Sequence, residues 1–334
     1  MKRLVAATVT IAAVVLAGAG AWVLTGSLET HPGVAEPIVL GAPVSDGNLL
    51  VFVASDQHYF AANRINLTFI GEDTGPAALR DLQDGRIDMA ATGEYPVVMK
   101  AFEHANISII TSYTRSYNEY LFGRIDRGIR NVSDLNGKTI GIPLGTQPEF
   151  FLGRFLELHG MSVKDVHLVN LPPQQAGSAI ADGSIDAVVV WEPFASRIQE
   201  ENPDGLASWQ VQSGQALFGV LVCRNDWIQQ HPDRVRNVLA SLAQAEAYTA
   251  VSPAGAQAVL QDHYHYSGDY IARIWPENKY SLTLDQSLVT AMEDESRWMI
   301  ANNITNATAV PDFRNYIYPD GLEGVKPGSV NIIT

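Results

Sequence analysis

The chain has 334 residues, of which 46% are apolar, so it can bury a sizeable core and is not a disordered chain. Its formal net charge is −14 at pH 7, and its 22 Lys and Arg residues form no run. We therefore expect no nucleic-acid partner, because such partners require clustered cations.

Residues 1–25 are predicted to be a targeting or anchoring element. A short basic start precedes an apolar run, and Ala-Gly-Ala at 19–21 fits the cleavage site of a secretory signal peptide. Residues 4–25 are also long enough to span a bilayer as an uncleaved N-terminal transmembrane helix. Both alternatives place the rest of the protein outside the cytoplasm, either secreted or held at the membrane. Residues 26–36 are predicted to be a linker.

The chain then repeats one pattern at a spacing near 100 residues. A β-rich run meets a Gly/Pro loop at 41–43 and again at 141–143, and an Asp-Gly-x-Ile-Asp segment at 84–88 recurs at 182–186. Each of these segments follows a short helical pattern and begins a strand, which predicts two α/β lobes with largely parallel sheets. Such sheets bind ligands at the carboxyl ends of their strands, so the loops that follow these strands are candidate cleft walls.

Two predicted crossings of the chain define the domain boundaries. Lobe I is expected to comprise residues 37–124 and 222–334, and lobe II residues 125–221. Strands near residues 120–126 and 216–223 would connect the lobes and form a hinge.

The C-terminal third is predicted to be mostly helical. Apolar periodicity indicates helices over residues 231–251, 253–264 and 284–303, the first with a proline in its first turn. The single cysteine, Cys223, lies in an apolar run typical of a buried strand, so we expect a core thiol. One cysteine also excludes an intrachain disulfide.

Three segments resemble the type II periplasmic solute-binding proteins of ABC importers. They are DGRIDMAATGEYP, VSDLNGKTIGIPLGTQPEFFLGRFLELHGM and DGSIDAVVVWEPF. More narrowly, the chain is similar to the branch that serves aliphatic sulfonates, taurine, nitrate and thiamine precursors. The resemblance runs from about Pro37 to Ile304 and implies an α/β fold of two hinge-linked lobes with a ligand cleft between them. The lipid-anchor cysteine of many exported relatives is missing.

The resemblance also implies which segments line the cleft. Gly145 to Gln147 stand at the start of a predicted helix, where backbone N–H groups and the helix dipole favour an anionic ligand group. Glu94 and Glu192 favour a cation or a hydrogen-bond donor, or else form an ion pair across the hinge. Arg115 is either a partner for an anion or a surface residue. The predicted ligand-binding residues are Ser45, Asp46, Thr92, Gly93, Glu94, Gly145, Thr146, Gln147, Trp191 and Glu192.

These observations predict the extracytoplasmic solute-binding component of an ABC importer. We expect a small organic solute, similar to a sulfonate, to taurine or to a thiamine precursor, and membrane permease subunits as partners of a monomer. No catalytic residue, cofactor or metal is expected, since His263 and His265 alone are a weak metal signal. Two alternatives stay open: an enzyme on the same fold, similar to pyrimidine synthases or menaquinone-pathway enzymes, and a sensor ectodomain.

Overall fold

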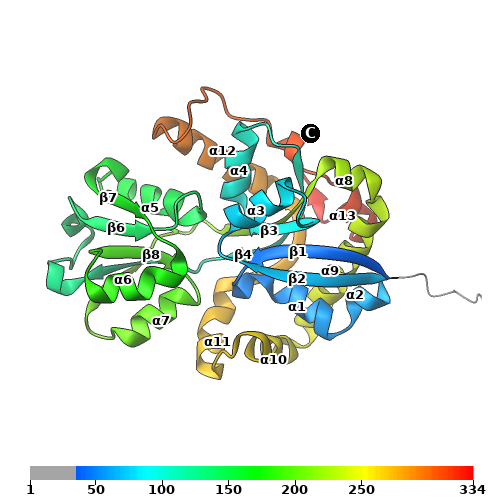
Figure 1. Cartoon of the computed structure of the whole chain (residues 1–334), viewed down its shortest axis with the longest axis horizontal. Coiled ribbons are helices and arrows are strands. Elements are labelled where there is room, and N and C mark those ends of the chain that lie inside the picture. Colours follow the sequence, from blue (N-terminus) through cyan, green and yellow to red (C-terminus); the bar gives the residue numbers. More distant parts are fainter. Residues whose placement is uncertain (1–34, 334) are drawn as a thin grey trace, which may run out of the picture. The chain divides into compact units, whose positions relative to one another are not determined.

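Two separate β-sheets organise residues 35–333, which are the residues that the computed structural model describes (Figure 1). The predicted signal peptide or anchor at 1–25 lies outside these residues. Within the described part of the chain, no helix has the length and apolar character needed to cross a membrane.

The first sheet has seven strands in the order β12-β11-β4-β10-β3-β1-β2. Strand β1 pairs in parallel with β2 and β3, whereas β10 runs antiparallel to both β3 and β4. We call this sheet and the helices packed on it lobe I. Its strands are β1 (Glu36–Pro43), β2 (Ile65–Glu72), β3 (Met89–Gly93), β4 (Ile107–Ser116), β10 (Leu217–Arg224), β11 (Asn278–Asp285) and β12 (Val330–Asn331).

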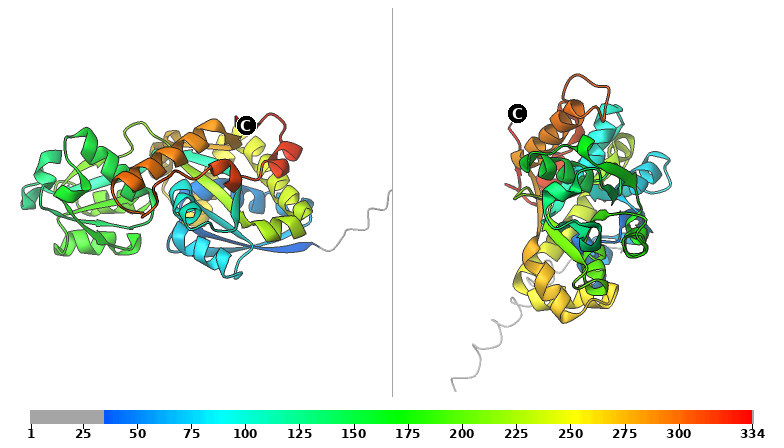
Figure 2. Two further views of the ribbon diagram at one scale, coloured as in Figure 1. Left: turned by 90° about the horizontal axis from the view of Figure 1, so that it is seen from above. Right: turned by 90° about the vertical axis from the view of Figure 1, so that its left-hand side faces the viewer.

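Helices cover both faces of this sheet (Figures 1 and 2). Strands β2 and β3 flank β1 on opposite sides, so right-handed crossovers place α1 (Leu49–Asp56) and α3 (Gly75–Gln83) on opposite faces. Long α9 (Pro232–Val251) packs against α1, and α4 (Glu94–Phe102) lies beside β3. Burial on both faces explains why β3 and β10 are almost continuously apolar.

The second sheet has five strands in the order β7-β6-β8-β5-β9. Strand β6 pairs in parallel with β7 and β8, and β5 runs antiparallel to β8 and β9. We call this sheet and its helices lobe II. Its elements are β5 (Glu119–Arg124), β6 (Thr139–Ile142), α5 (Gln147–Leu158), β7 (His167–Asn170), α6 (Ala176–Asp182), β8 (Ala187–Trp191), α7 (Phe194–Glu201) and β9 (Leu206–Gln210).

The predicted C-terminal helices are confirmed. Helix α9 begins at Pro232, α10 spans Pro253–Tyr264 and α12 spans Gln286–Ala301. Cys223 is fully buried in β10, as the apolar run predicted. The remaining helices are α2 (Tyr59–Ala62), α8 (Asn225–Gln230), α11 (Gly268–Ile274) and α13 (Asp320–Val325).

The internal repeat corresponds to one hydrogen bond made twice. Asp88 Oδ2 accepts from the backbone N–H of Val39 at 2.8 Å, and Asp186 Oδ2 accepts from that of Thr139 at 2.9 Å. In each lobe the repeated aspartate therefore ties the start of one parallel strand, β3 or β8, to its parallel neighbour, β1 or β6.

The repeat also contains a matched close approach. A Cβ atom at Gly41 would lie 2.7 Å from Ile87 Cδ1, and one at Gly141 would lie 2.9 Å from Ile185 Cδ1. Both distances are too short for a real Cβ contact, so each glycine makes room for the isoleucine of the same repeat.

The chain crosses between the sheets twice. It leaves β4 at Ser116 and enters β5 at Glu119, and it returns from β9 to β10 through residues 211–216. The whole of β5 belongs to the second sheet and the whole of β10 to the first. The crossings therefore fall a few residues before the predicted boundaries at 124/125 and 221/222. Both strands have a neighbour on each side in their sheets, so their apolar pattern does not reveal which sheet they join.

Candidate functional site

A small pocket is lined by residues of both lobes. Lobe I supplies the ends of β1, β3 and β4, and lobe II supplies the starts of β5 and α5 and the end of β8. Strands β1, β3 and β8 contribute their carboxyl ends, which is where open α/β sheets bind ligands.

Six of the ten predicted site residues line this pocket: Ser45, Thr92, Gly93, Thr146, Gln147 and Trp191. Gly93 leaves room for the side-chain amide of Gln147, because a Cβ at this position would collide with that amide. That amide donates from Nε2 to Glu94 Oε2 at 2.9 Å, which is a direct bond between the lobes beside the pocket.

The other four predicted residues, Asp46, Glu94, Gly145 and Glu192, are not among its lining residues. At Gly145 the backbone N–H donates to Glu149 Oε2 at 2.8 Å. The first turn of α5 therefore already holds a carboxylate of the protein itself, which differs from the free N–H expected there. Thr146, the N-cap residue, donates its hydroxyl to the carbonyl of Pro143.

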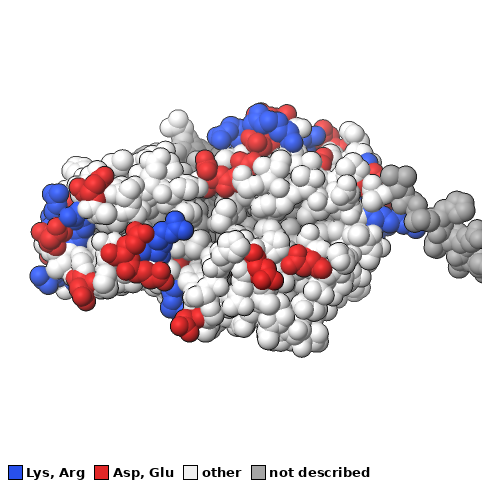
Figure 3. Space-filling model, turned by 60° about the horizontal axis from the view of Figure 1, so that its bottom comes forward, with Lys and Arg blue, Asp and Glu red and all other residues white. Residues whose placement is uncertain are grey.

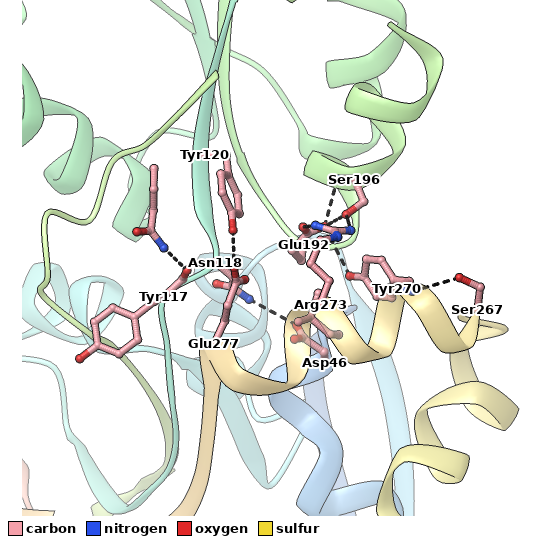
Figure 4. Close-up of polar contacts among 12 residues, drawn as sticks. Asp46, Tyr117, Asn118, Tyr120, Glu192, Ser196, Ser267, Tyr270, Arg273 and Glu277 are labelled. Atoms are coloured by element: carbon pink, nitrogen blue, oxygen red, sulfur yellow. Dashed lines mark hydrogen bonds and ion pairs between the residues drawn. The ribbon is translucent and has the colours of Figure 1, made fainter. Parts of the chain in front are cut away.

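Glu192 does not line the pocket, and its carboxylate contacts residues of both lobes (Figure 4). Its Oε1 lies 2.9 Å from Arg273 Nη1, and its Oε2 accepts from the backbone and hydroxyl of Ser196 at 3.0 and 2.6 Å. Tyr270 donates to the same Oε2 at 3.4 Å. The structure thus contains the alternative left open above, an ion pair between the lobes. We call it the Glu192–Arg273 ion pair.

Asp46 is fully buried close to that ion pair (Figure 4). Its Oδ2 accepts from Asn278 Nδ2 at 2.6 Å, and its Oδ1 accepts from Asn118 Nδ2 at 3.4 Å. Burial, and then the negative charge of Glu192, raise the pKa of Asp46 to about 7. Asp46 therefore fixes the segment after β1 through these hydrogen bonds and does not itself line the pocket.

Glu94 begins α4 and is also fully buried. Its Oε2 accepts from Gln147 and from the backbone N–H of Phe218 at 3.0 Å, whereas Oε1 has no hydrogen-bond partner among the described residues. Burial raises the pKa of Glu94 to about 7. Glu94 thus lies behind the pocket wall with one oxygen unused.

The sequence analysis missed Glu119, which does line the pocket. Glu119 is the first residue of β5, is 1% exposed, and its Oε2 has no partner within the described chain. Burial, together with the charge of Glu94, raises the pKa of Glu119 to about 8. The available signal was an acidic residue at the start of an apolar strand, directly after the crossing between the lobes.

Hydroxyl groups complete the polar lining. Thr92 Oγ1 and Thr114 Oγ1 are buried and also lack a partner among residues 35–333. Trp191, Tyr113 and Leu217 supply apolar walls. The pocket therefore combines apolar surface with a few polar groups that the protein leaves free.

Within residues 35–333, the pocket lining lacks basic side chains. None of the described residues that line the pocket is Lys, Arg or His. Arg115 forms an ion pair with Asp285 and lies 4.8 Å over the Phe218 ring, outside the lining. On the face drawn in Figure 3, Lys and Arg likewise lie beside Asp and Glu.

The two candidate metal-binding histidines do not come together with further ligands. His263 Nε2 lies 3.0 Å from Asp56 Oδ1, and its ring packs 4.4 Å from that of Phe52. Over the described range 35–333, no cluster of three or more His, Cys, Asp or Glu is arranged to hold a metal ion.

Comparison with known proteins gives a family match and several relatives. Residues 48–256 match the family described as NMT1/THI5 like. The taurine-binding periplasmic protein of Escherichia coli is 26% identical over 182 residues, which are 54% of this chain and 57% of that protein. A Brucella abortus protein named as a binding protein is 25% identical over 211 residues. That match covers 62% of this chain and spans 65% of the length of the relative.

Solved structures share the fold. The alkanesulfonate-binding protein SsuA of Xanthomonas axonopodis, bound to MOPS, superposes with a TM-score of 0.74 at 19% identity, covering 85% of this chain and 98% of that one. The desulfurization enzyme DSZB superposes with a TM-score of 0.64 at 16% identity, covering 87% of this chain and 98% of that one. The two-lobed α/β fold thus occurs in a binding protein and in an enzyme.

Proposed function

The chain belongs to the NMT1/THI5-like family, and on that premise we propose that it is the extracytoplasmic solute-binding component of an ABC importer. The observation that carries this proposal is the pocket, which both lobes line with six residues predicted from the sequence. Two curated relatives are named as binding proteins, one of them periplasmic and taurine-binding, which supports the same conclusion. Permease subunits in the membrane would receive the solute from a monomer of this protein.

The mechanism we propose is closure of the two lobes around the solute. The side chain of Gln212 joins both crossings, because Nε2 donates to the carbonyl of Ser116 at 2.8 Å and Oε1 accepts from the N–H of Glu119 at 3.0 Å. Rotation about these crossings would separate Gln147 from Glu94 and Glu192 from Arg273. A solute that contacts both lobes favours the closed arrangement, since only that arrangement offers all its contacts.

The proposed ligand contacts come from both sides of the pocket. Ser45, Thr92 and Gly93 would act from lobe I, and Thr146, Gln147 and Trp191 from lobe II. The named relatives suggest a small organic solute of the taurine or sulfonate kind, and a thiamine precursor is the other candidate. The indole of Trp191, opposed edge-on by Phe194 at 6.1 Å, would pack on its apolar part.

A thermal-shift screen of the full chain tests the proposal. The solutes are taurine, alkanesulfonates, nitrate, bicarbonate and thiamine precursors, and a true ligand should stabilise the protein by about 2.7 kcal/mol at a hundred times its Kd. Trp191→Ala should abolish most of that stabilisation, whereas Trp275→Ala, outside the pocket, should retain it. A wild-type protein that none of these solutes stabilises would contradict a solute-binding role.

An enzyme is the second candidate, because DSZB shares the fold. We propose binding without covalent chemistry. Cys223, the one cysteine of the sequence, is fully buried in β10, and burial raises the pKa of its thiol, so this thiol is a poor nucleophile. Prolonged incubation of the best ligand with the protein, followed by mass spectrometry, should return the ligand unchanged. Turnover of that ligand would favour the enzyme.

A further inference from the structure

The chemistry of the ligand follows from the polar groups that the pocket leaves without partners; this inference rests on the proposed function. Three such groups, Thr92 Oγ1, Thr114 Oγ1 and Glu119 Oε2, belong to lining residues and have no partner in the described chain. Hydroxyl groups either donate or accept; a carboxyl group donates while it is protonated, whereas its ionised form only accepts. Glu119 is therefore the group that discriminates between ligands.

Charge around Glu119 disfavours an anion at this position. Buried Glu94 lies close enough to raise the pKa of Glu119, and buried Glu295 of α12 in turn feels the charge of Glu94. The two guanidinium groups described above are engaged in ion pairs, Arg273 with Glu192 and Arg115 with Asp285. A sulfonate or carboxylate placed against Glu119 would thus face further acids and no free cation of the pocket lining.

The neighbour of Glu119 fits a cation. Glu119 and Trp191 are directly opposite residues of the antiparallel pair β5–β8, so their side chains stand on the same face of the sheet, and both line the pocket. An ammonium group beside Glu119 favours the ionised carboxylate, so its binding would lower the raised pKa of Glu119 and release the proton. The ammonium group then gains from the carboxylate through charge-assisted hydrogen bonds and from an indole face through its quadrupole.

We propose that the pocket binds a small solute through a protonated amine held by the Glu119 carboxylate and packed on Trp191. The hydroxyls of Thr92 and Thr114 then offer hydrogen bonds to the other polar atoms of the solute. The acid of a bipolar solute would lie away from Glu119 and its neighbouring acids.

Matched pairs of solutes test this assignment by calorimetry on the full chain. The pairs are taurine with ethanesulfonate, and β-alanine with propionate, which differ only in the amine. Wild-type protein should bind the amine member of a pair at least about tenfold more tightly. Glu119→Gln should weaken amine binding by about ten- to a hundredfold and leave the amine-free member unchanged or tighter. Glu119→Asp, which keeps the charge, should retain the preference.

Several outcomes would overturn the assignment. Equal or tighter binding of the amine-free member by the wild type would do so, as would a folded Glu119→Gln variant that binds the amine as tightly as the parent. An amine-free solute as the sole ligand found in the broad screen would overturn the amine site and leave the solute-binding function intact. Absence of any ligand would contradict the function itself.

Discussion

Arg273 Nη1 lies 2.9 Å from Glu192 Oε1, and this contact joins α11 of lobe I to the segment after β8 of lobe II. The carboxylate side chain is 1% exposed, whereas the guanidinium side chain is 48% exposed. A buried charge on one lobe is therefore neutralised by a half-exposed charge on the other. Opening of the lobes would leave Glu192 with Ser196 as its remaining partner from lobe II.

Removal of Arg273 should destabilise the closed arrangement. Arg273→Ala leaves Glu192 buried without its cation, and we expect a loss of about 1–3 kcal/mol in the free energy of unfolding. Small-angle scattering of the ligand-free variant should give a larger radius of gyration than that of the parent. Arg297→Ala is the control, because Arg297 pairs with Glu293 on the surface and should matter by about 0.5 kcal/mol or less. A variant as compact and as stable as the parent would show that the ion pair does not hold the lobes together.

Protein stability should fall as the pH rises, partly through Glu119. Its folded-state pKa of about 8 exceeds the ordinary 4.5, so the folded protein keeps a proton that the unfolded chain has released. The stability from this group is complete below about pH 4.5 and is lost progressively up to about pH 8. Glu94 and Asp46, with pKa values raised to about 7, act in the same direction.

The measurement is the melting temperature between about pH 5 and pH 9. Glu119→Gln cannot release this proton, so its melting temperature should fall less over the range than that of the wild type. Glu201→Gln, at an exposed position of α7, should keep the wild-type slope. Identical slopes for Glu119→Gln and the wild type would show that Glu119 ionises at its ordinary pKa.

Gly93→Ala should impair ligand binding more than folding. The added methyl would displace the amide of Gln147 and break its 2.9 Å bond to Glu94 between the lobes. We expect about 1 kcal/mol, or five- to tenfold in Kd, with a small change in melting temperature. Gly71→Ala, which would meet no atom within 4 Å, controls for the change in residue type. If Gly93→Ala bound the ligand as tightly as the parent, the bond between Gln147 and Glu94 would not contribute to lobe closure.

The two repeated aspartates should have similar effects on stability. Asp88→Ala and Asp186→Ala each leave the N–H of a residue in the parallel neighbour strand, Val39 in β1 or Thr139 in β6, without its carboxylate acceptor. Each substitution should cost about 1–2 kcal/mol in chemical denaturation, because a hydrogen bond to a charged acceptor is lost. If only one of the two substitutions lowered stability, the two aspartates would be similar in sequence but would not contribute equally to stability.

Local pattern predicted much of this molecule. The repeat placed β1, β6 and the Asp-Gly-x-Ile-Asp strands, because strand ends and turn residues are encoded over a few positions. The family resemblance, together with the repeat, indicated the six residues that line the pocket. Neither revealed Arg273 as the partner of Glu192, since 81 residues separate them and the contact depends on how the two lobes meet. Glu119 escaped for a related reason, because nothing in its own segment shows that its carboxyl is buried without a partner.

The central place of β10 has a consequence for synthesis of the chain. Strands β5 to β9 all lie between residues 119 and 210, so their sheet is complete in sequence before β10, at residues 217–224, has been made. Until then β3 and β4 have no strand between them, and each offers an unpaired edge. The nascent protein therefore passes through a stage in which the inserted lobe can fold while the enclosing lobe cannot. A chain that terminates near residue 215 should therefore contain the complete sheet of lobe II and, in lobe I, two unpaired strand edges that favour aggregation.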